Sequence, residues 1–389
     1  MIARDTLRHA FRAHYGRDPR LYRAPGRVNL IGEHTDYNGG FVLPMAIDRE
    51  TVVAAAPRAD TRVHVHSLNL DETAEFDLAH PNAPRRGLWL DYLEGVAQAL
   101  MGRGLRLVGA DLMLLSDVPP GAGLSSSAAL EVATGLALAS VSGQEPDRVM
   151  LALAGQEAEH IYVGMMCGIM DQFIAALGRA GHALLIDCRT LQATQVPLDT
   201  TDVAVVICDS QVKHELASSA YNTRRVECER GVELLSKALP GITQLRDVSV
   251  ADFAQYEARL PEPIRRRCRH VITENERTLR AADALRRGDL AEMGRLMNCS
   301  HESLRDDYEV SCRELDLLTE IAWGCAGVLG ARMTGGGFGG STVNLVRRAA
   351  LDSFQQEISV EYEKRANITP RIYVSDAGDG AKEIGMDEG

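Results

Sequence analysis

A polar segment near the start of the chain gathers side chains suited to binding a polyhydroxylated ligand or a metal ion. Glu33, His34 and Asp36 follow the strand-like run 27–31, and two glycines, at 39 and 40, end the segment. Carboxylates accept hydrogen bonds from hydroxyl groups and also ligate Mg²⁺, so the cluster by itself leaves a sugar site and a metal site open. A solvated turn without a ligand is the third interpretation.

A second segment has the composition of a phosphate-binding loop. Gly121 and Gly123 precede three serines at 125–127, and an alanine- and leucine-rich stretch follows. Glycines let main-chain amides approach an anion, and the first turn of a helix supplies unpaired N–H groups. A serine N-cap after a Pro-Gly turn is the simpler alternative, but it explains only one serine of the run. The pattern therefore favours phosphate binding.

A third segment is rich in glycine. Residues 335–340 match the Gly-x-Gly-x-x-Gly fingerprint of dinucleotide-binding proteins, which would suggest a dehydrogenase. That fingerprint opens a helix, whereas Thr342 and Val343 continue into a strand-like run. We therefore expect a turn between two strands that closes over a ligand or passes close to another segment, with a purely structural hairpin turn as the alternative. The chain has no Gly-Lys dipeptide, which excludes a P-loop.

Two further carboxylate contexts bear on chemistry. Asp171 lies in the run Gly-Ile-Met-Asp-Gln-Phe, where apolar neighbours predict a half-buried carboxylate and a helix N-cap is the alternative. Glu157 and Glu159 fall on a predicted helix with their side chains roughly 200° apart, so at most one of them faces a given site.

The composition limits the class of partner. The 389 residues include 42 Lys+Arg and 54 Asp+Glu, a formal net charge of -12, and only 5% are aromatic. A strongly acidic chain is repelled by phosphate backbones and anionic lipid, which excludes nucleic acids and membrane surfaces as partners. The eight cysteines form no Cys-x-x-Cys pair, so we expect free thiols in a reducing compartment, the cytoplasm. Leu7, Phe11 and Tyr15 recur at helical spacing and predict an amphipathic N-terminal helix, not a signal peptide.

The elements that must position these residues are a mixture of strands and helices, which predicts an α+β fold. A chain of this length exceeds what one hydrophobic core usually holds, so we expect two domains, with a linker at 197–202. The tail from Asp376 is rich in glycine and acidic residues and is expected to be frayed. Strands are predicted over 27–31, 51–56, 62–66, 109–116, 182–187, 203–208, 328–333 and 341–346. Helices are predicted over 88–101, 125–141, 147–163, 215–237, 270–287 and 311–323.

Along essentially its whole length the chain resembles the galactokinases, a family of the GHMP small-molecule kinases. Segments 26–40, 119–130 and 334–342 are similar to the galactokinase signature, the phosphate-binding motif and the third, glycine-rich motif. Segments 167–172, 218–225 and 301–308 are also similar to the family's patterns. The resemblance implies a two-domain GHMP fold with the active site in the cleft between residues 1–200, the N-terminal kinase domain, and residues 201–389, the C-terminal domain.

The resemblance further implies ATP-dependent phosphorylation of the anomeric hydroxyl of α-D-galactose, the first committed step of galactose catabolism, by a monomer. Asp171 would be the base and Arg27 would stabilise charge. The sugar would meet Glu33, His34, Thr35, Asp36, Gly168, Asp171 and Tyr221. ATP would meet Ser67, Gly121, Ala122, Gly123, Leu124, Ser125, Ser126 and Ser127. Ser127 and Glu159 would hold Mg²⁺.

Two alternatives stay open at this point. One is a non-catalytic regulatory protein that binds galactose and ATP, although the intact Ser-Ser-Ser-Ala-Ala stretch favours an enzyme. The other is a related sugar 1-kinase acting on N-acetylgalactosamine or arabinose. Cys167, beside the expected sugar site, is a candidate for reaction with alkylating agents.

Overall fold

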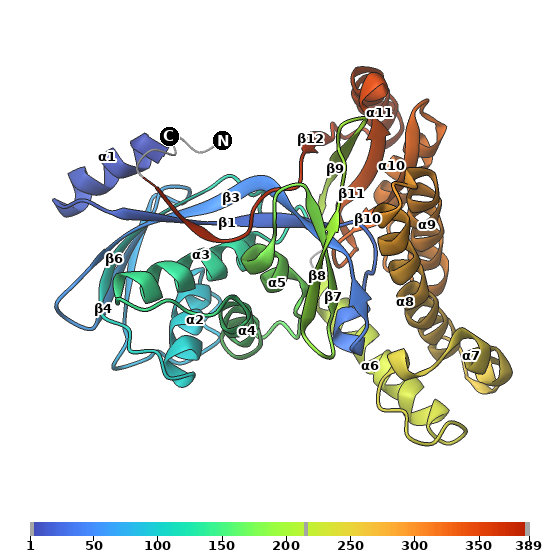
Figure 1. The fold of residues 1–389 in the computed structure, drawn as a ribbon, viewed down its shortest axis with the longest axis horizontal. Coiled ribbons are helices and arrows are strands. Elements are labelled where there is room, and N and C mark those ends of the chain that lie inside the picture. The colour runs from blue at the N-terminus through green and yellow to red at the C-terminus, as the bar shows by residue number, and fades with distance from the viewer. Residues whose placement is uncertain (1–3, 214–216, 386–389) are drawn as a thin grey trace.

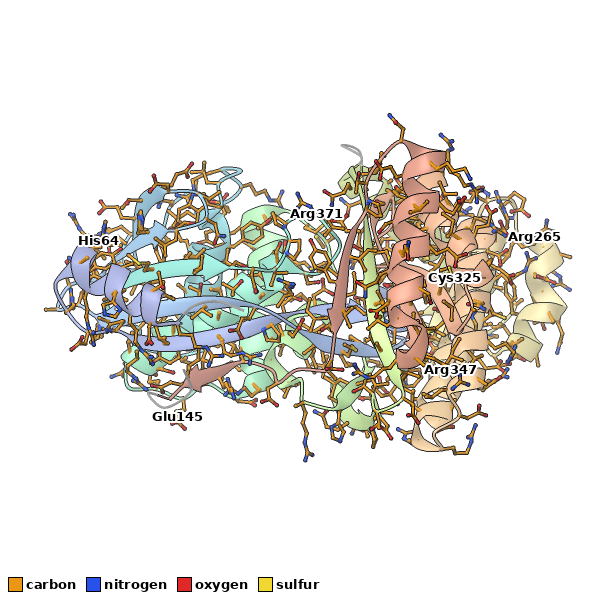
Figure 2. All side chains as sticks on the ribbon, turned by 90° about the horizontal axis from the view of Figure 1, so that it is seen from above. His64, Glu145, Arg265, Cys325, Arg347 and Arg371 are labelled. Carbon is orange, nitrogen blue, oxygen red and sulfur yellow. The ribbon has the colours of Figure 1, made fainter. Side chains whose placement is uncertain are left out.

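The structure is a computed structural model that describes residues 4–213 and 217–385. Two lobes lie side by side along the long axis of the molecule (Figure 1). We call the part built on the larger sheet, with helices α1–α5, the N-terminal lobe, and the part with helices α6–α11 the C-terminal lobe. In the view from above, His64 marks the far end of the first lobe and Arg265 the far end of the second (Figure 2).

In the described residues of the N-terminal lobe, six strands form one sheet in the order β13-β1-β3-β6-β4-β5. Strands β4 and β6 run parallel, and the pairs around them run antiparallel. The strands are β1 (Arg20–Asn29), β3 (Pro44–Pro57), β4 (Arg62–Ser67), β5 (Glu72–Asp77), β6 (Ala110–Ser116) and β13 (Lys382–Ile384). The helices are α1 (Arg4–Tyr15), α2 (Leu90–Gly102), α3 (Ser126–Val141), α4 (Arg148–Ala158) and α5 (Met170–Leu177).

Strand β3 shows why its sequence is apolar without a break. Val53 and Ala55 point into the core formed with α2–α5, whereas Val52 and Ala54 pack against Leu7 and other residues on the opposite face. Successive strand residues alternate between the two faces of a sheet, and here helices cover both faces. The amphipathic stripe predicted for the N-terminal helix is confirmed, because α1 supplies that second cover.

The C-terminal lobe repeats this arrangement. Its sheet has the order β10-β11-β9-β12, and alternate residues of β9 face two different cores, one with α8 and α9 and one with α10 and α11. The strands are β10 (Val328–Thr334), β11 (Gly339–Arg347), β9 (Val203–Lys213) and β12 (Arg371–Ser375). The helices are α6 (Ala217–Leu235), α7 (Val250–Tyr256), α8 (Ile264–Arg286), α9 (Leu290–Ser303), α10 (Arg313–Gly324) and α11 (Leu351–Ala366). A small sheet of β2 (Phe41–Val42), β7 (His182–Asp187) and β8 (Gln192–Pro197) lies between the lobes.

The predicted mixture of strands and helices is confirmed, with three main differences. The helix expected over 147–163 is α-helical to Ala158 and continues as a π-helix from Glu159 to Val163. Helix α8 starts six residues earlier than expected, and α5, α7, α9 and α11 were not predicted. Residues 215 and 216 of the helix expected over 215–237 lie outside the described residues. In the described ranges, no helix combines the length and the apolar character that crossing a bilayer requires.

The expectation of a frayed tail after Asp376 is wrong for the residues described. Ala377, Ala381 and Ile384 are buried, and β13 pairs with β1 in the N-terminal lobe. The glycines suggested disorder, but Gly378 and Gly380 bond to the main chain of Ala46 and Gly178. The segment therefore returns from the C-terminal lobe and completes the first sheet.

Candidate active site

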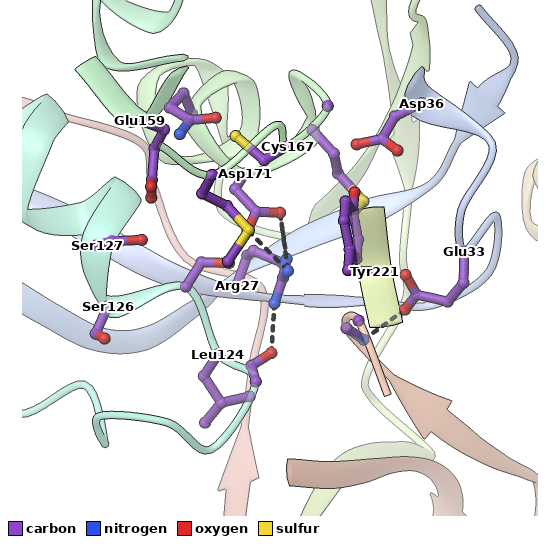
Figure 3. Close-up of a pocket in the computed structure, with 18 of the residues that line it drawn as sticks. Arg27, Glu33, Asp36, Leu124, Ser126, Ser127, Glu159, Cys167, Asp171 and Tyr221 are labelled. Atoms are coloured by element: carbon purple, nitrogen blue, oxygen red, sulfur yellow. Dashed lines mark hydrogen bonds and ion pairs between the residues drawn. The ribbon is translucent and has the colours of Figure 1, made fainter. Parts of the chain in front are cut away.

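A pocket of about 430 Å³ lies between the lobes and is lined by residues of both. In Figure 3, Ser126, Ser127 and Glu159 stand on one side, Glu33 and Asp36 stand on the other, and Arg27 and Asp171 lie between them. The lining residues are Arg27, Glu33, His34, Asp36, Tyr92, Gly121, Gly123, Leu124, Ser125, Ser126, Ser127, Glu159, Val163, Met165, Cys167, Gly168, Met170, Asp171, Gln172, Tyr221, Gly335, Gly336, Gly337 and Phe338. Most of the predicted site residues are therefore brought together.

Arg27 and Asp171 form a two-point ion pair at the centre of this pocket. Arg27 Nε and Nη2 each donate a 2.9 Å hydrogen bond, to Oδ1 and Oδ2 of Asp171 respectively. The arginine side chain is 6% exposed and the aspartate side chain 30%, so the carboxylate is the partner open to a ligand. Asp171 lies in the first turn of α5 with its carboxylate directed to Arg27, so the N-cap alternative is wrong.

Arg27 also holds the loop of residues 121–125. Its Nη1 donates to the carbonyl of Gly123, and its main-chain amide donates to the carbonyl of Leu124 at 3.0 Å. The loop alternates into left-handed backbone, with φ of 73° at Gly121, 74° at Gly123 and 59° at Ser125, and α3 begins at Ser126. One arginine therefore fixes the position of Asp171 relative to the glycine- and serine-rich loop.

The glycine-rich turn between β10 and β11 packs against this loop. A Cβ at Gly335 would lie 3.1 Å from the carbonyl oxygen of Gly123, and one at Gly337 would lie 2.2 Å from that of Val310. Ser341 Oγ donates a 2.7 Å hydrogen bond to the carbonyl of Ala122. The expectation of a turn that passes close to another segment is confirmed. The dinucleotide-binding interpretation is wrong, because the glycines lead into strand β11 and not into a helix.

On the opposite side of the pocket, burial raises the pKa values of the carboxylates. Burial, and then the nearby charge of Asp171, raises the pKa of Asp36 to about 7. Burial also raises the pKa of Glu33, whose Oε1 accepts a 2.7 Å hydrogen bond from the amide of Gly335. A Cβ at Gly168 would lie 1.8 Å from Oδ2 of Asp36, so a larger residue there would displace the Asp36 carboxylate.

The His34 side chain joins two parts of the site. Its Nδ1 lies 2.8 Å from the Tyr37 hydroxyl and its Nε2 lies 3.2 Å from the carbonyl oxygen of Gly336. Because a carbonyl only accepts, Nε2 carries the proton and Nδ1 accepts from Tyr37. Burial lowers the pKa of His34 to about 3, so the ring is neutral.

Three predicted ligand residues lie outside the pocket. Thr35 is buried beneath its turn and donates to the carbonyls of Gly32 and Phe41. Ser67, at the end of β4, accepts a hydrogen bond from the amide of Leu70. Ala122 is buried in the core between the lobes.

Glu159 and Ser127 form the part of the pocket suited to a divalent cation. Glu159 is 6% exposed, and burial raises its pKa to about 7, against the effect of the neighbouring Ser127 hydroxyl. Glu131 lies beside Glu159, and burial raises its pKa well above its usual value. In residues 4–213 and 217–385, no three His, Cys, Asp or Glu side chains form a cluster that could hold a metal ion. Carboxylate, hydroxyl and phosphate oxygens are a donor set that Mg²⁺ prefers.

Glu157 points away from this site. Its carboxylate pairs with Arg103 Nη1 at 2.5 Å, which confirms that only one of the two glutamates faces the pocket. Glu159 is the first residue of the π-helix, and short π-helical turns within α-helices are common at functional sites.

Sequence reasoning missed Tyr92 and Glu131. Tyr92 lies on α2 and Glu131 on α3, two helices made mainly of buried apolar residues. In the sequence, both positions look like parts of the hydrophobic core. Cys167 lines the pocket, but burial and then the charges of Glu159 and Glu131 raise the pKa of its thiol well above the usual value. A raised pKa lowers the fraction of the reactive thiolate, so this environment does not favour the expected reactivity.

Three family models match the chain. The galactokinase galactose-binding signature matches residues 9–57, the GHMP kinase N-terminal domain matches 91–179, and the GHMP kinase C-terminal domain matches 281–364. The galactokinase of Chloroflexus aurantiacus is 53% identical over 381 residues, which cover 98% of this chain and 97% of that relative. The galactokinase of Actinobacillus succinogenes is 44% identical over 391 residues, covering 98% and 100%.

Solved structures agree with these matches. The crystal structure of Lactococcus lactis galactokinase with galactose has a TM-score of 0.94 at 36% identity and covers 98% of this chain and 100% of that one. Methanococcus jannaschii mevalonate kinase, with a TM-score of 0.65 at 17% identity and coverage of 93% and 99%, shares the fold. On the relatives' identity and the matched family models, the chain belongs to the galactokinase family of the GHMP kinases.

Proposed function

We propose that the protein transfers the γ-phosphate of ATP to the anomeric hydroxyl of α-D-galactose and releases galactose 1-phosphate and ADP. The observation that carries this proposal is the position of the Arg27–Asp171 pair. It lies between a loop with the features of a phosphate site and a group of carboxylates suited to a sugar (Figure 3). The proposal therefore assigns sugar recognition to the carboxylates, proton acceptance to Asp171 and phosphate binding to the loop, all within one pocket.

In this mechanism Asp171 accepts the proton of the anomeric hydroxyl as that oxygen forms a bond to the γ-phosphorus. The bond from the γ-phosphorus to the bridging oxygen of ADP breaks, and the proton leaves Asp171 for solvent after the products depart. Phosphoryl transfer depends mainly on alignment and charge stabilisation. Arg27 provides both, because it orients the carboxylate at two points and places a positive charge beside the reacting oxygen.

The loop of residues 121–127 would bind the phosphates at the start of α3, where main-chain amides and the helix dipole favour an anion. Ser127 and Glu159 would hold Mg²⁺, which supplies positive charge to the triphosphate when it is bound. The raised pKa of Glu159 supports this role, since a buried carboxylate gains from a cation beside it.

Glu33, Asp36, Gly168 and Tyr221 would read the hydroxyl pattern of the sugar. Three donors converge on Oε1 of Glu33, so we expect its Oε2 to accept from a sugar hydroxyl. Recognition by buried hydrogen bonds rejects an epimer more strongly than a pocket that measures size alone. We expect a cytoplasmic monomer; the free thiols of all eight cysteines, each within the described ranges, support a reducing compartment.

A coupled ADP-release assay with ATP and Mg²⁺ tests the proposal on galactose, glucose, N-acetylgalactosamine and arabinose. Turnover on galactose alone is the expected result. Turnover on another sugar would keep the mechanism and overturn the specificity. Binding of galactose and ATP by calorimetry without turnover would favour the regulatory protein.

A further inference from the structure

Ser125 has a backbone conformation that normally belongs to glycine. Its φ is 59° and its ψ is 50°, in the left-handed region, at the residue before α3. Two other left-handed positions of the same loop, Gly121 and Gly123, are glycines. A residue with a Cβ is strained there, and a strained residue at a ligand site indicates that its side chain has a use.

The hydroxyl of Ser125 is directed to Asp171. Ser125 Oγ donates to Oδ2 of Asp171, the same oxygen that accepts from Arg27 Nη2 at 2.9 Å. Ser125 stands at the N-cap position of α3, yet within the described ranges its side chain makes no cap hydrogen bond. The position therefore serves the carboxylate and not the end of the helix.

This contact completes a three-donor cradle around one carboxylate. Arg27 Nε fixes Oδ1 at 2.9 Å, and Arg27 Nη2 and Ser125 Oγ converge on Oδ2. Arg27 approaches from β1 and Ser125 from the glycine- and serine-rich loop, so the plane of the carboxylate is set from two directions. Three donors on two separate elements hold the carboxylate plane more firmly than the two donors of Arg27 would alone.

We propose that Ser125 is a positioning residue for Asp171, and that its hydroxyl couples the carboxylate to the loop that holds the phosphates. The inference rests on the proposed function, in which Asp171 is the base. It differs from the role of phosphate ligand that the motif suggests for all three serines. The hydroxyl would keep a constant distance between the base and the γ-phosphate as the loop takes up ATP.

Ser125→Gly is the decisive variant, because glycine accepts the left-handed backbone without strain and removes the whole side chain, including the hydroxyl. We expect kcat at saturating galactose and ATP to fall about 10- to 100-fold, as for a misplaced catalytic group. The Kd of ATP measured by calorimetry should stay within about twofold, and the melting temperature should stay equal or rise. Ser125→Ala keeps the strain, so it should lose the same kcat and melt at a lower temperature than Ser125→Gly. Ser126→Ala is the matched loop variant, and its main effect should be a higher KM for ATP.

Three results would overturn parts of this account in different ways. An unchanged kcat in Ser125→Gly would remove the hydroxyl from the mechanism. Weaker ATP binding with an unchanged kcat would make Ser125 a phosphate ligand. An inactive wild-type protein would contradict the proposed function itself, and the inference about Ser125 would fall with it.

Discussion

The main-chain amide of Gly335 donates a 2.7 Å hydrogen bond to Oε1 of Glu33, across 302 positions of the chain. Thr334 Oγ1 and Arg332 Nη1, on the preceding strand, each lie 3.4 Å from the same oxygen. Arg332 is fully buried, and among the neighbouring groups its charge most strongly opposes the rise in the pKa of Glu33 that burial causes. Residues of the C-terminal lobe therefore orient Glu33, a carboxylate of the N-terminal lobe that we propose binds the sugar.

Replacing Arg332 by methionine should weaken galactose binding and stability while sparing ATP. Removing one partner of a buried ion pair leaves the other uncompensated, at about 3–5 kcal/mol. We expect a lower melting temperature and a KM for galactose raised at least about tenfold, with the Kd of ATP unchanged. Adding Glu33→Gln to this variant should restore part of the stability but not the KM. Equal melting temperatures for wild type and Arg332→Met would contradict this role.

Asp171→Asn should abolish turnover and leave both substrates bound. The amide keeps the shape of the side chain but is a far weaker proton acceptor, and loss of a general base lowers kcat by about 10²–10⁴-fold. The ADP-release assay measures the loss, and calorimetry with ATP and galactose provides the control for folding. Full activity in this variant would remove Asp171 from the mechanism.

Asp36→Ala should lose discrimination between galactose and glucose far more than affinity for ATP. Asp36 is a half-buried carboxylate directed into the pocket across from the phosphate loop (Figure 3). A buried acceptor left unpaired by the wrong epimer is the source of that discrimination. The measurement is the ratio of kcat/KM for the two sugars. An unchanged ratio would assign the reading of the hydroxyl pattern to other residues.

The two glutamates of the 157–159 stretch offer a matched pair for testing the magnesium site. Glu159→Gln should raise the Mg²⁺ concentration needed for half-maximal rate at least about tenfold, because a neutral amide is a poorer ligand for a hard cation. Glu157→Gln removes only a partly exposed pair with Arg103 and should leave that concentration unchanged. Galactose binding without nucleotide should be equal in both variants. Equal Mg²⁺ dependence in both would contradict the assignment.

Asp36→Asn should stabilise the ligand-free protein increasingly as the pH rises. The folded protein raises the pKa of Asp36 from 3.8 to about 7. Between these values the folded state keeps a proton that the unfolded state has released, so this group lowers the free energy of unfolding as the pH increases through that range. The gain in the variant should be absent near pH 4 and reach about 2–4 kcal/mol by pH 8.

Comparing the variant with wild type is necessary because two histidines act in the opposite direction. Burial lowers the pKa of His34 to about 3 and of His270 to about 4, so both favour the folded state more as the pH rises toward 6.5. Urea unfolding at pH 4, 6 and 8 measures the difference. A constant difference across this range would show that Asp36 does not titrate as described.

The sequence predicted those helices and strands that can be recognised from the composition of their own residues. The run 203–208 is apolar on both faces of β9, and the alanine-rich stretch after Ser127 is a helix that is buried over most of its length. Strands β5 and β8 were missed because they are mainly polar and partly exposed, so their sequences lack the alternation that marks a half-buried strand.

In the candidate site, too, local motifs could be predicted from the sequence, whereas contacts between residues far apart in the chain could not. The two glycine-rich segments could be recognised from composition and from the strand that follows the second. The contacts of Arg332 and Gly335 with Glu33 join residues 299 and 302 positions apart, and no local sequence pattern predicts them. The tail was misjudged for the same reason, because the order of residues 382–384 comes from the hydrogen bonds of β1.

The pairing of β13 with β1 also affects how the protein is made. Arg20 and Glu383, which form an ion pair across these strands, are 363 positions apart. At about 5–20 residues per second, a ribosome needs roughly 20–70 s to synthesise the chain between them. During that time β1, which carries Arg27, has its outer edge without the strand that covers it in the finished protein, and an open edge can pair with other chains. The edge of β1 that β13 covers is therefore a place where nascent copies on neighbouring ribosomes can pair with one another.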